Sequence, residues 1–213
     1  MGRRALRQIA PDLDLSGWLL CLDELPKTVT SDTLFGQRRP LQIEVGSGRG
    51  LFLRTAAATE PQHGFLGCEV VHKYAQLTAL GLASRNLDNA KVLGGDALRL
   101  FAEFLPDQSV AAVHVYFPDP WWKRRHRKRR VMRESFLRDV ERVLEPGGCL
   151  HFWTDVEEYF RVSLKAIAAH SRLEGPIPVE QQPAEHDLDY RTHFERRMRQ
   201  HQADVFRSLF RKH

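Results

Sequence analysis

The sequence lacks the features that mark secreted, membrane-spanning and zinc-binding proteins. Its three cysteines, Cys21, Cys68 and Cys149, lie far apart and form no Cys-x-x-Cys pair, which argues against a disulfide framework and a metal site. No apolar run is long enough to cross a bilayer. The basic start is not followed by the hydrophobic core of a signal peptide. We therefore expect a cytoplasmic protein with no metal and no membrane partner.

Positive charge is present but concentrated. The formal net charge is +5, yet the run 123–130 alone holds seven Lys or Arg and no acid, so the remainder sums to 5 − 7 = −2. A second basic cluster lies near the end of the chain. Localised positive charge is typical of surfaces that bind phosphate backbones, although solvated faces and nuclear-import tags also use such runs. We favour a nucleic acid as the partner, because an acidic, aromatic motif directly precedes the run.

Apolar runs alternate with helical spacing from residue 41 onward. Strands are expected at 41–45, 64–70, 90–94, 110–117 and 149–153, and helices at about 50–59, 73–86, 134–144 and 156–170. Residues 175–189 read as a loop, 192–200 as a helix and 203–211 as a last edge strand. This order predicts an α/β fold with a mostly parallel sheet and helices on both faces. The length favours one domain, residues 40–213, after an N-terminal extension of residues 1–39.

A glycine-rich turn follows the first of these strands. The segment 44–50 reads Glu-Val-Gly-Ser-Gly-Arg-Gly, and its glycines Gly46 and Gly48 allow a ligand to press against backbone at a helix start. The spacing G-x-G-x-G differs from the dinucleotide pattern G-x-G-x-x-G. An acid, Glu44, directly before the first glycine suits a cationic ligand better than a pyrophosphate. An ordinary strand-to-helix turn is the alternative.

Three further acids follow later strands of the same sheet. Glu69 ends the second strand, Asp96 follows the third and Asp119 follows the fourth. Because strand ends of a parallel sheet line one crevice, we expect these acids and Glu44 to converge. Glu69 is placed to accept from a ribose diol and Asp96 to face an adenine amino group. Four carboxylates indicate S-adenosylmethionine, a nucleoside with positive charge, while helix capping remains an equal alternative for Asp96.

The segment 117–122, Phe-Pro-Asp-Pro-Trp-Trp, is the most informative in the chain. Its prolines fix the backbone on both sides of Asp119, and the basic run 123–130 follows directly. Trp121 and Trp122 could stack on an extruded base or pack under the loop. This arrangement predicts an enzyme that acts on a nucleic acid base.

These motifs together resemble the bacterial tRNA (guanine-N7-)-methyltransferases, over roughly residues 40–200. The resemblance rests on 117–121, the basic residues after it, the glycine turn, Thr154-Asp155 and 192–195. It implies a Rossmann-like, seven-stranded class I methyltransferase sheet with one antiparallel strand, and methyl transfer to a guanosine in the tRNA variable loop. The sequence departs from the family at Trp122, where a proline is usual.

The resemblance also implies roles for individual residues. Glu44, Gly46, Gly48, Glu69, Asp96 and Asp119 would contact S-adenosylmethionine, with Asp119 as the catalytic residue. Lys123, Asp155, Thr192, His193, Phe194 and Glu195 would bind substrate, and Arg124, Arg125, His126, Arg127, Lys128 and Arg129 would lie against tRNA. From spacing alone, Asp155 could instead cap a helix, and Thr192 and Glu195 could form a capping box.

The chemistry places modest demands on these residues. Guanine N7 has an in-plane lone pair and no proton, so the enzyme needs orientation rather than a strong base. Asp119 could accept from guanine N1–H and its amino group, and stabilise the cationic base that forms. The alternatives are methylation of another RNA and a non-catalytic RNA-binding protein on the same scaffold. The sequence leaves open whether the chain is a monomer or a homodimer.

Overall fold

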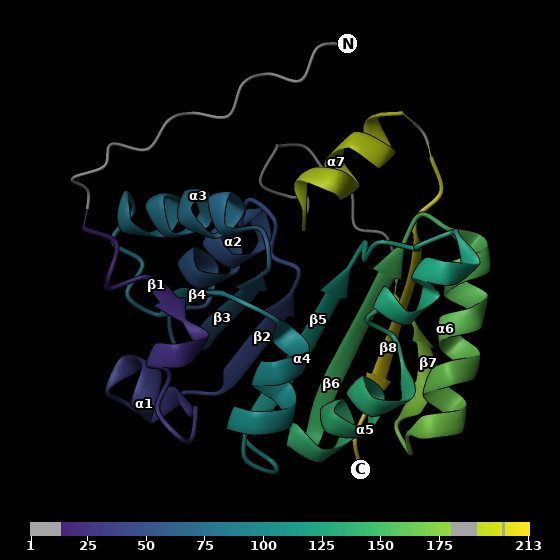
Figure 1. Cartoon of the computed structure of the whole chain (residues 1–213), viewed down its shortest axis with the longest axis horizontal. Coiled ribbons are helices and arrows are strands. Elements are labelled where there is room, and N and C mark those ends of the chain that lie inside the picture. The colour runs from purple at the N-terminus through teal and green to yellow at the C-terminus, as the bar shows by residue number, and fades with distance from the viewer. Residues whose placement is uncertain (1–13, 180–190, 202) are drawn as a thin grey trace.

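One mixed sheet with helices on both faces forms the body of the molecule (Figure 1). The computed structural model describes residues 14–179, 191–201 and 203–213. Within these residues the sheet has eight strands, in the order β1-β4-β3-β2-β5-β6-β8-β7. The strands are β1 Leu19–Cys21, β2 Leu41–Val45, β3 Gly64–Glu69, β4 Ala90–Gly94, β5 Val110–Tyr116, β6 Leu144–Thr154, β7 Glu174–Pro178 and β8 Phe206–Arg211.

The helices lie between the strands, and the first of them, residues 31–35, was not predicted. They are α1 Ser31–Phe35, α2 Leu51–Thr59, α3 His72–Ala83, α4 Ala97–Arg99, α5 Glu134–Val143, α6 Glu157–His170 and α7 His193–Gln200, with short turns η1 Leu22–Glu24, η2 Leu100–Phe104 and η3 Arg124–Arg129. No helix among the described residues is both long and apolar enough to cross a bilayer.

The direction of the strands confirms the predicted α/β fold. Strands β1 to β6 pair in parallel, and β8 runs antiparallel to both β6 and β7. The expected antiparallel strand is therefore β8. The sheet has eight strands in place of the expected seven, because the short strand β1 pairs with β4 at one edge.

The interpretation of residues 175–189 as a loop is wrong for its first four residues. Glu174–Pro178 forms β7, which pairs with β8 through its backbone, with Ile177 opposite Leu209. Its side chains are exposed or half-buried, so no apolar alternation marks it in the sequence. The remainder, 180–189, lies outside the described residues.

Part of the N-terminal extension is joined to the sheet. Trp18 donates from Nε1 to the carbonyl of Leu87 at 2.9 Å, and the Lys91 ammonium donates to the carbonyl of Gly17 at 2.5 Å. These contacts hold β1 at the sheet edge. The proposed domain boundary at residue 39 stays a prediction.

Two apolar layers hold helices to the opposite faces of the sheet. Helices α2 and α3 cover one face, where Phe65, Tyr116 and Trp153 meet Phe52. Helices α4, α5 and α6 cover the other, where the buried side chains include Ile43, Val113, Phe136, Phe152 and Tyr159. Full burial of one such side chain contributes about 1.5–3 kcal/mol. The packed layers fix the strand ends from which the functional residues project.

Candidate active site at the carboxyl ends of the strands

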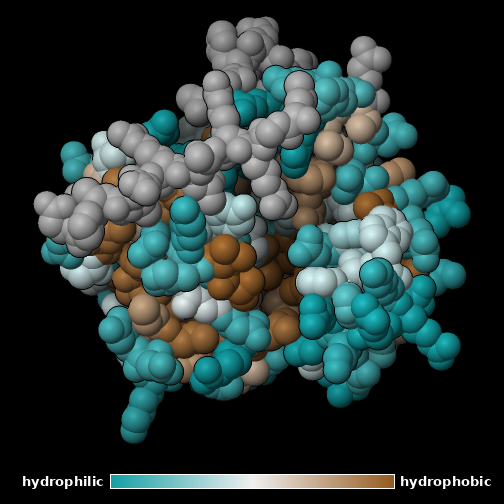
Figure 2. Space-filling view, turned by 45° about the horizontal axis from the view of Figure 1, so that its top comes forward, coloured by the Kyte–Doolittle hydropathy of each residue, from teal (hydrophilic) through white to brown (hydrophobic). Residues whose placement is uncertain are grey.

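A cavity of about 440 Å³ opens where β2, β3, β4 and β5 end. Figure 2 shows a hollow with apolar walls on this side of the molecule. The predicted site residues Gly46, Gly48, Glu69, Asp96 and Asp119 all line the cavity. A volume of this size suits a small-molecule ligand. The described chain therefore brings these five residues together as the parallel sheet requires. Glu44, which was expected to converge with them, is buried and does not line the cavity.

The glycine turn has a backbone that other residues rarely adopt. Gly46, Gly48 and Gly50 have φ values of +81°, +55° and +68°. A Cβ on Gly46 or Gly48 would meet no atom within 4 Å, so it would enter the cavity, whereas one on Gly50 would overlap Thr78. The first two glycines thus expose backbone to a ligand. The third allows α3 to approach closely.

The backbone of Gly48 is held by a hydrogen bond at its N–H and another at its carbonyl. Its N–H donates to the Glu69 carboxylate at 2.8 Å, and its carbonyl accepts from the hydroxyl of Thr78 at 3.2 Å. Thr78 is fully buried. The second oxygen of Glu69 accepts from the N–H of Val71 at 2.8 Å. Glu69 therefore braces two loops of the cavity as well as lining it, and Thr78 is a supporting residue that the sequence analysis missed.

Two buried carboxyl groups lie at this end of the sheet. Burial raises the pKa of Glu69, while the hydrogen bonds from Val71 and Gly48 lower it in part. Glu44 is only 2% exposed, and burial together with the Glu69 charge raises its pKa well above the usual range. Within the described residues its Oε2 atom has no hydrogen-bond partner. A nearby cationic ligand would compensate this buried group.

Asp96 caps a helix and also lines the cavity. Its carboxylate accepts from the N–H of Leu98 at 2.8 Å and caps α4. The same residue lines the cavity and is exposed. A carboxylate has about four acceptor positions, so the cap leaves room for a ligand donor.

The loop that carries Asp119 has an unusual backbone. Phe117 and Trp121 have φ values of +51° and +42°, a conformation that costs on the order of 1–3 kcal/mol for such residues. Asp119 is exposed and lines the cavity, with Phe117, Pro118 and Trp121 beside it. The structure thus presents the predicted central carboxylate to the cavity on a tightly turned loop.

The basic segment folds back on this loop and stabilises it. The guanidinium of Arg129 lies 5.0 Å from the centre of the Trp121 ring, and the His126 ring meets the same indole edge-on at 5.5 Å. Arg130 donates from Nε to the carbonyl of Pro120 at 2.7 Å and lies over Tyr159. The position of Arg129 in the cavity wall was not predicted, because it depends on how the basic segment folds back onto the loop.

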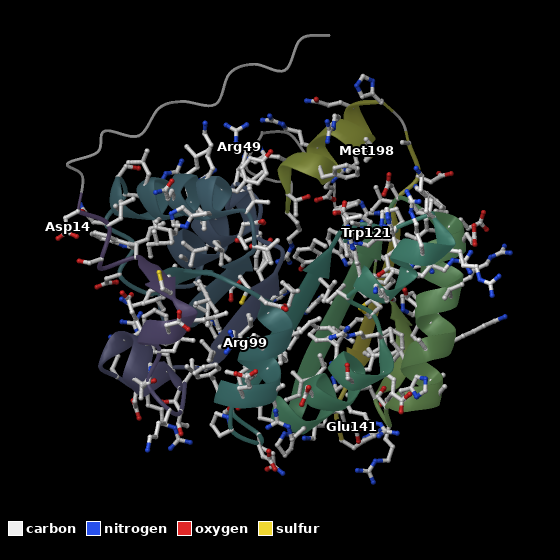
Figure 3. The ribbon with its side chains drawn as sticks, in the orientation of Figure 1. Asp14, Arg49, Arg99, Trp121, Glu141 and Met198 are labelled. Carbon is white, nitrogen blue, oxygen red and sulfur yellow. The ribbon has the colours of Figure 1, made fainter. Side chains whose placement is uncertain are left out.

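The rest of the predicted RNA-binding run faces solvent. Lys123, Arg124, Arg125, Arg127 and Lys128 are exposed and His126 is half-buried. Trp121, labelled in Figure 3, lies at the upper end of the sheet, below α7. The cationic surface therefore adjoins the mouth of the cavity, as a polyanionic substrate requires.

The residues 192–195 mainly organise the start of α7. The Thr192 hydroxyl accepts from the N–H of Glu195 at 2.9 Å, which is one half of the predicted capping box. The other half is absent from the described residues, because the Glu195 carboxylate accepts from the N–H of Arg191 rather than Thr192. Glu195 is buried and pairs with the buried Arg207 at 3.0 Å. Phe194 packs on Phe117 with ring centres 4.9 Å apart. His193 is the first helical residue. The buried ion pair holds α7 in place, and Phe194 connects it to the Asp119 loop.

Asp155 does not cap the helix that follows it. The N-cap of α6 is Val156, which has no side-chain cap, and the N–H of Val156 donates to the Thr154 hydroxyl at 3.3 Å. Asp155 follows the end of β6, two strands from the glycine turn, and is half-buried. The helix-capping alternative for this residue is wrong.

A buried polar row that the sequence analysis missed lies beneath the cavity. The hydroxyl of Tyr116, which lines the cavity, is 2.9 Å from His114 Nδ1. His114 Nε2 is 2.8 Å from the side-chain oxygen of Gln42, and its ring stacks on His151 at 4.7 Å. Burial lowers the pKa of His114 well below its usual range, and it lowers the pKa of His151 to about 4. Both imidazoles are therefore neutral at pH 7.

The assembled site has two chemically distinct parts. One is a cavity with carboxylates and glycine backbone, suited to a small ligand that carries positive charge and hydroxyl donors. The other is an exposed cationic surface beside it, suited to a phosphate backbone. Asp119 lies between them. The described residues contain no cluster of His, Cys, Asp or Glu that could hold a metal ion.

Comparison with known proteins agrees with this division. A family model described as "Putative methyltransferase" matches residues 38–208. A tRNA (guanine-N(7)-)-methyltransferase of Rhodopirellula baltica is 49% identical over all of this chain and 80% of its own length. A Cupriavidus necator protein of the same name is 34% identical over 94% of this chain and 76% of its own.

Solved structures of similar shape are also methyltransferases. The 16S rRNA methyltransferase KamB has a TM-score of 0.60 at 15% identity, over 91% of this chain and 98% of its own. The aminoglycoside resistance methyltransferase NpmB1 has a TM-score of 0.56 at 19% identity, over 87% of this chain and 95% of its own. At such low identity these likenesses establish the fold alone.

Proposed function

The chain belongs to the tRNA (guanine-N7-)-methyltransferase family, and from this premise we propose which guanosine it methylates and which residues carry out the reaction. The enzyme transfers a methyl group from S-adenosylmethionine to N7 of a guanine in tRNA. The proposed target is a guanosine in the variable loop. The support for this position is the resemblance of the 117–121 motif and the basic segment to those of the bacterial enzymes.

The cavity residues fit S-adenosylmethionine. Gly46 and Gly48 leave space that a side chain would fill, and Glu69 and Asp96 offer carboxylate oxygens to hydroxyl and amino groups. The unpartnered buried oxygen of Glu44 suits the neighbourhood of a cationic group. The cofactor supplies an electrophilic methyl group when bound. In this proposal these five residues hold it, together with Asp119.

Asp119 has the position that guanine recognition requires. Guanine N7 attacks as a neutral lone pair, so rate depends on holding the base in line with the methyl group. The exposed Asp119 carboxylate can accept from N1–H and the 2-amino group, a donor pair that adenine does not present. As methyl transfer makes the base cationic, the same carboxylate stabilises it. Asp119 is therefore the proposed catalytic residue.

The remaining predicted residues contact the RNA in this proposal. Lys123 and the run 124–129 bind phosphates around the cavity mouth. Asp155 and residues Thr192 to Glu195, at the start of α7, form the opposite wall for the substrate. Because the Glu195 carboxylate is engaged with Arg207 and with the N–H of Arg191, it acts by positioning, and Phe194 reaches the Asp119 loop.

One observation carries the proposal: an exposed carboxylate stands where the cofactor cavity meets the cationic surface. The test is to incubate an unmodified tRNA transcript with methyl-labelled S-adenosylmethionine and to locate the label by nuclease digestion and mass spectrometry. We expect one labelled N7-methylguanosine in the variable loop, and no label in a transcript with adenosine there. Label at a guanosine elsewhere would overturn the assigned position.

A further inference from the structure

Trp122 is the exposed member of a pair of adjacent tryptophans. Its side chain is 58% exposed, whereas Trp18 and Trp121 are half-buried and Trp153 is buried. A single exposed apolar residue is ordinary. Trp122 differs because its neighbour Trp121 lines the cavity. Two consecutive indoles therefore occupy different environments, one in the cavity wall and one in solvent beside its mouth.

The backbone before Trp122 is held in place by named contacts. Arg130 holds the carbonyl of Pro120 at 2.7 Å. Arg129 and His126 pack on the ring of Trp121, whose φ of +42° shows how sharply the chain turns there. Trp122 follows directly on this braced residue. Its indole is therefore exposed to solvent on a rigid backbone, so that binding a partner costs less conformational entropy.

The surroundings of Trp122 define the chemistry of its partner. Lys123, Arg124 and Arg125 follow it in the chain and are exposed. The segment 120–133 contains no acid. A partner must therefore carry dense negative charge and also offer a flat apolar face. An unpaired nucleotide offers both, because its base stacks on an aromatic ring while its phosphate meets the cations.

We propose that Trp122 stacks on an unpaired base next to the guanosine that enters the cavity, and so keeps the two nucleotides apart. Trp121, in the cavity wall, then contacts the guanine itself. Because Trp121 lines the cavity and Trp122 is exposed beside its mouth, the two indoles can engage a guanine inside the cavity and its neighbour outside it. The inference rests on the proposed function for the identity of the RNA.

The experiment uses the full chain and tRNA that carries 2-aminopurine, whose fluorescence falls on stacking. The probe is placed, in separate transcripts, on either side of whichever guanosine the mapping experiment labels. We expect the wild-type protein to quench one of the two probes, Trp122→Phe to quench it partly and Trp122→Ala not at all. Loss of one stacked base should weaken tRNA binding about 5- to 160-fold.

Controls separate this inference from the proposed function and from misfolding. Val162→Ala removes another exposed apolar side chain, 44% exposed on α6, and should leave quenching and affinity unchanged. The KM for S-adenosylmethionine and the melting temperature should not change in Trp122→Ala. If Trp122→Ala binds and quenches like wild type, or wild type quenches neither probe, the inference is overturned while methylation by the wild type still stands.

Discussion

Two loops at the carboxyl end of the sheet are stabilised in opposite ways and suit different ligands. The glycine turn 46–50 follows β2, and the loop 117–122 follows the neighbouring strand β5. Both contain residues with positive φ. The glycine turn is held from within, by the Glu69 carboxylate and the buried Thr78 hydroxyl. The second loop is held from outside, by cations that fold back over it.

The difference follows from the ligands. A small cofactor needs backbone at close range and few fixed acceptors, which a buried network supplies. A folded RNA needs exposed charge and aromatic surface, which cannot be buried. The two halves of the site therefore have separate supports. Substitutions in one half should therefore leave binding by the other half unchanged.

The largest effect is expected at Asp119, which lies between the cofactor-binding half and the RNA-binding half of the site. Asp119→Asn keeps the shape of the side chain but removes the charge that faces the cationic base, so kcat should fall about 100- to 1000-fold. The affinity for tRNA should stay within about threefold, since the cations are untouched. Single-turnover kinetics and a binding titration measure the two quantities. Glu158→Gln, at an exposed position on α6, is the control and should change neither kcat nor the affinity for tRNA.

A smaller effect is expected from Glu69→Gln in the cofactor half. The amide loses the charge that accepts from the N–H groups of Gly48 and Val71, and hydrogen bonds to charged groups contribute about 1.5–3 kcal/mol. The Kd for S-adenosylmethionine should rise about 10- to 160-fold by that figure. Calorimetry measures it. A parallel loss of tRNA affinity would mean that the two loops share one support.

In the RNA half, the triple variant Arg124→Ala, Arg125→Ala and Arg127→Ala removes three exposed cations. The logarithm of tRNA affinity should depend less steeply on the logarithm of salt concentration, with a slope reduced by about 2–3. Cofactor affinity should be unchanged, because none of the three lines the cavity. An unaltered salt slope would exclude this segment from the interface.

The buried imidazoles beneath both loops affect the stability of the fold rather than the binding of either ligand. The pKa of His151 is lowered by burial from 6.5 to about 4, so the unfolded chain takes up its proton first as the pH falls. This group therefore stabilises the fold above pH 6.5, and that stability is lost as the pH falls towards 4. In His151→Gln the pH dependence of the unfolding free energy should be shallower by about 1.4 kcal/mol per pH unit over that window.

Urea unfolding of the wild type and of His151→Gln between pH 4 and 7 measures this difference. Glu44 and Glu69 have raised pKa values and act in the opposite direction. They are present in both proteins, so their contribution cancels in the comparison. Identical slopes would show that His151 is not buried as a neutral ring.

The sequence predicted the parts of the molecule that depend on local pattern. The strands β2 to β6 are marked by apolar runs, and the rule for parallel sheets placed Glu69, Asp96 and Asp119 at one crevice. Strand β7 was missed, because Gly175, Pro176 and its exposed side chains carry no strand pattern. Strand β1 was missed because it has three half-buried residues.

Contacts between distant segments could not be predicted from pattern. The pairing of Glu195 with Arg207, buried between α7 and β8, joins charges that spacing alone assigned to a cap and a basic cluster. The position of Arg129 over Trp121 depends on a backbone with positive φ at a bulky residue, which sequence statistics disfavour. Such strained positions are expected at functional sites.

The most direct test of the central claim, that Asp119 reads the guanine edge, compares a change in the enzyme with a change in the base. Wild type and Asp119→Asn are each assayed in single turnover on tRNA with guanosine or inosine, which lacks the 2-amino group, at the mapped position. We predict that inosine slows the wild type at least tenfold, about the value of one hydrogen bond to a charged group, and slows Asp119→Asn much less. An equal loss in both enzymes would contradict the account.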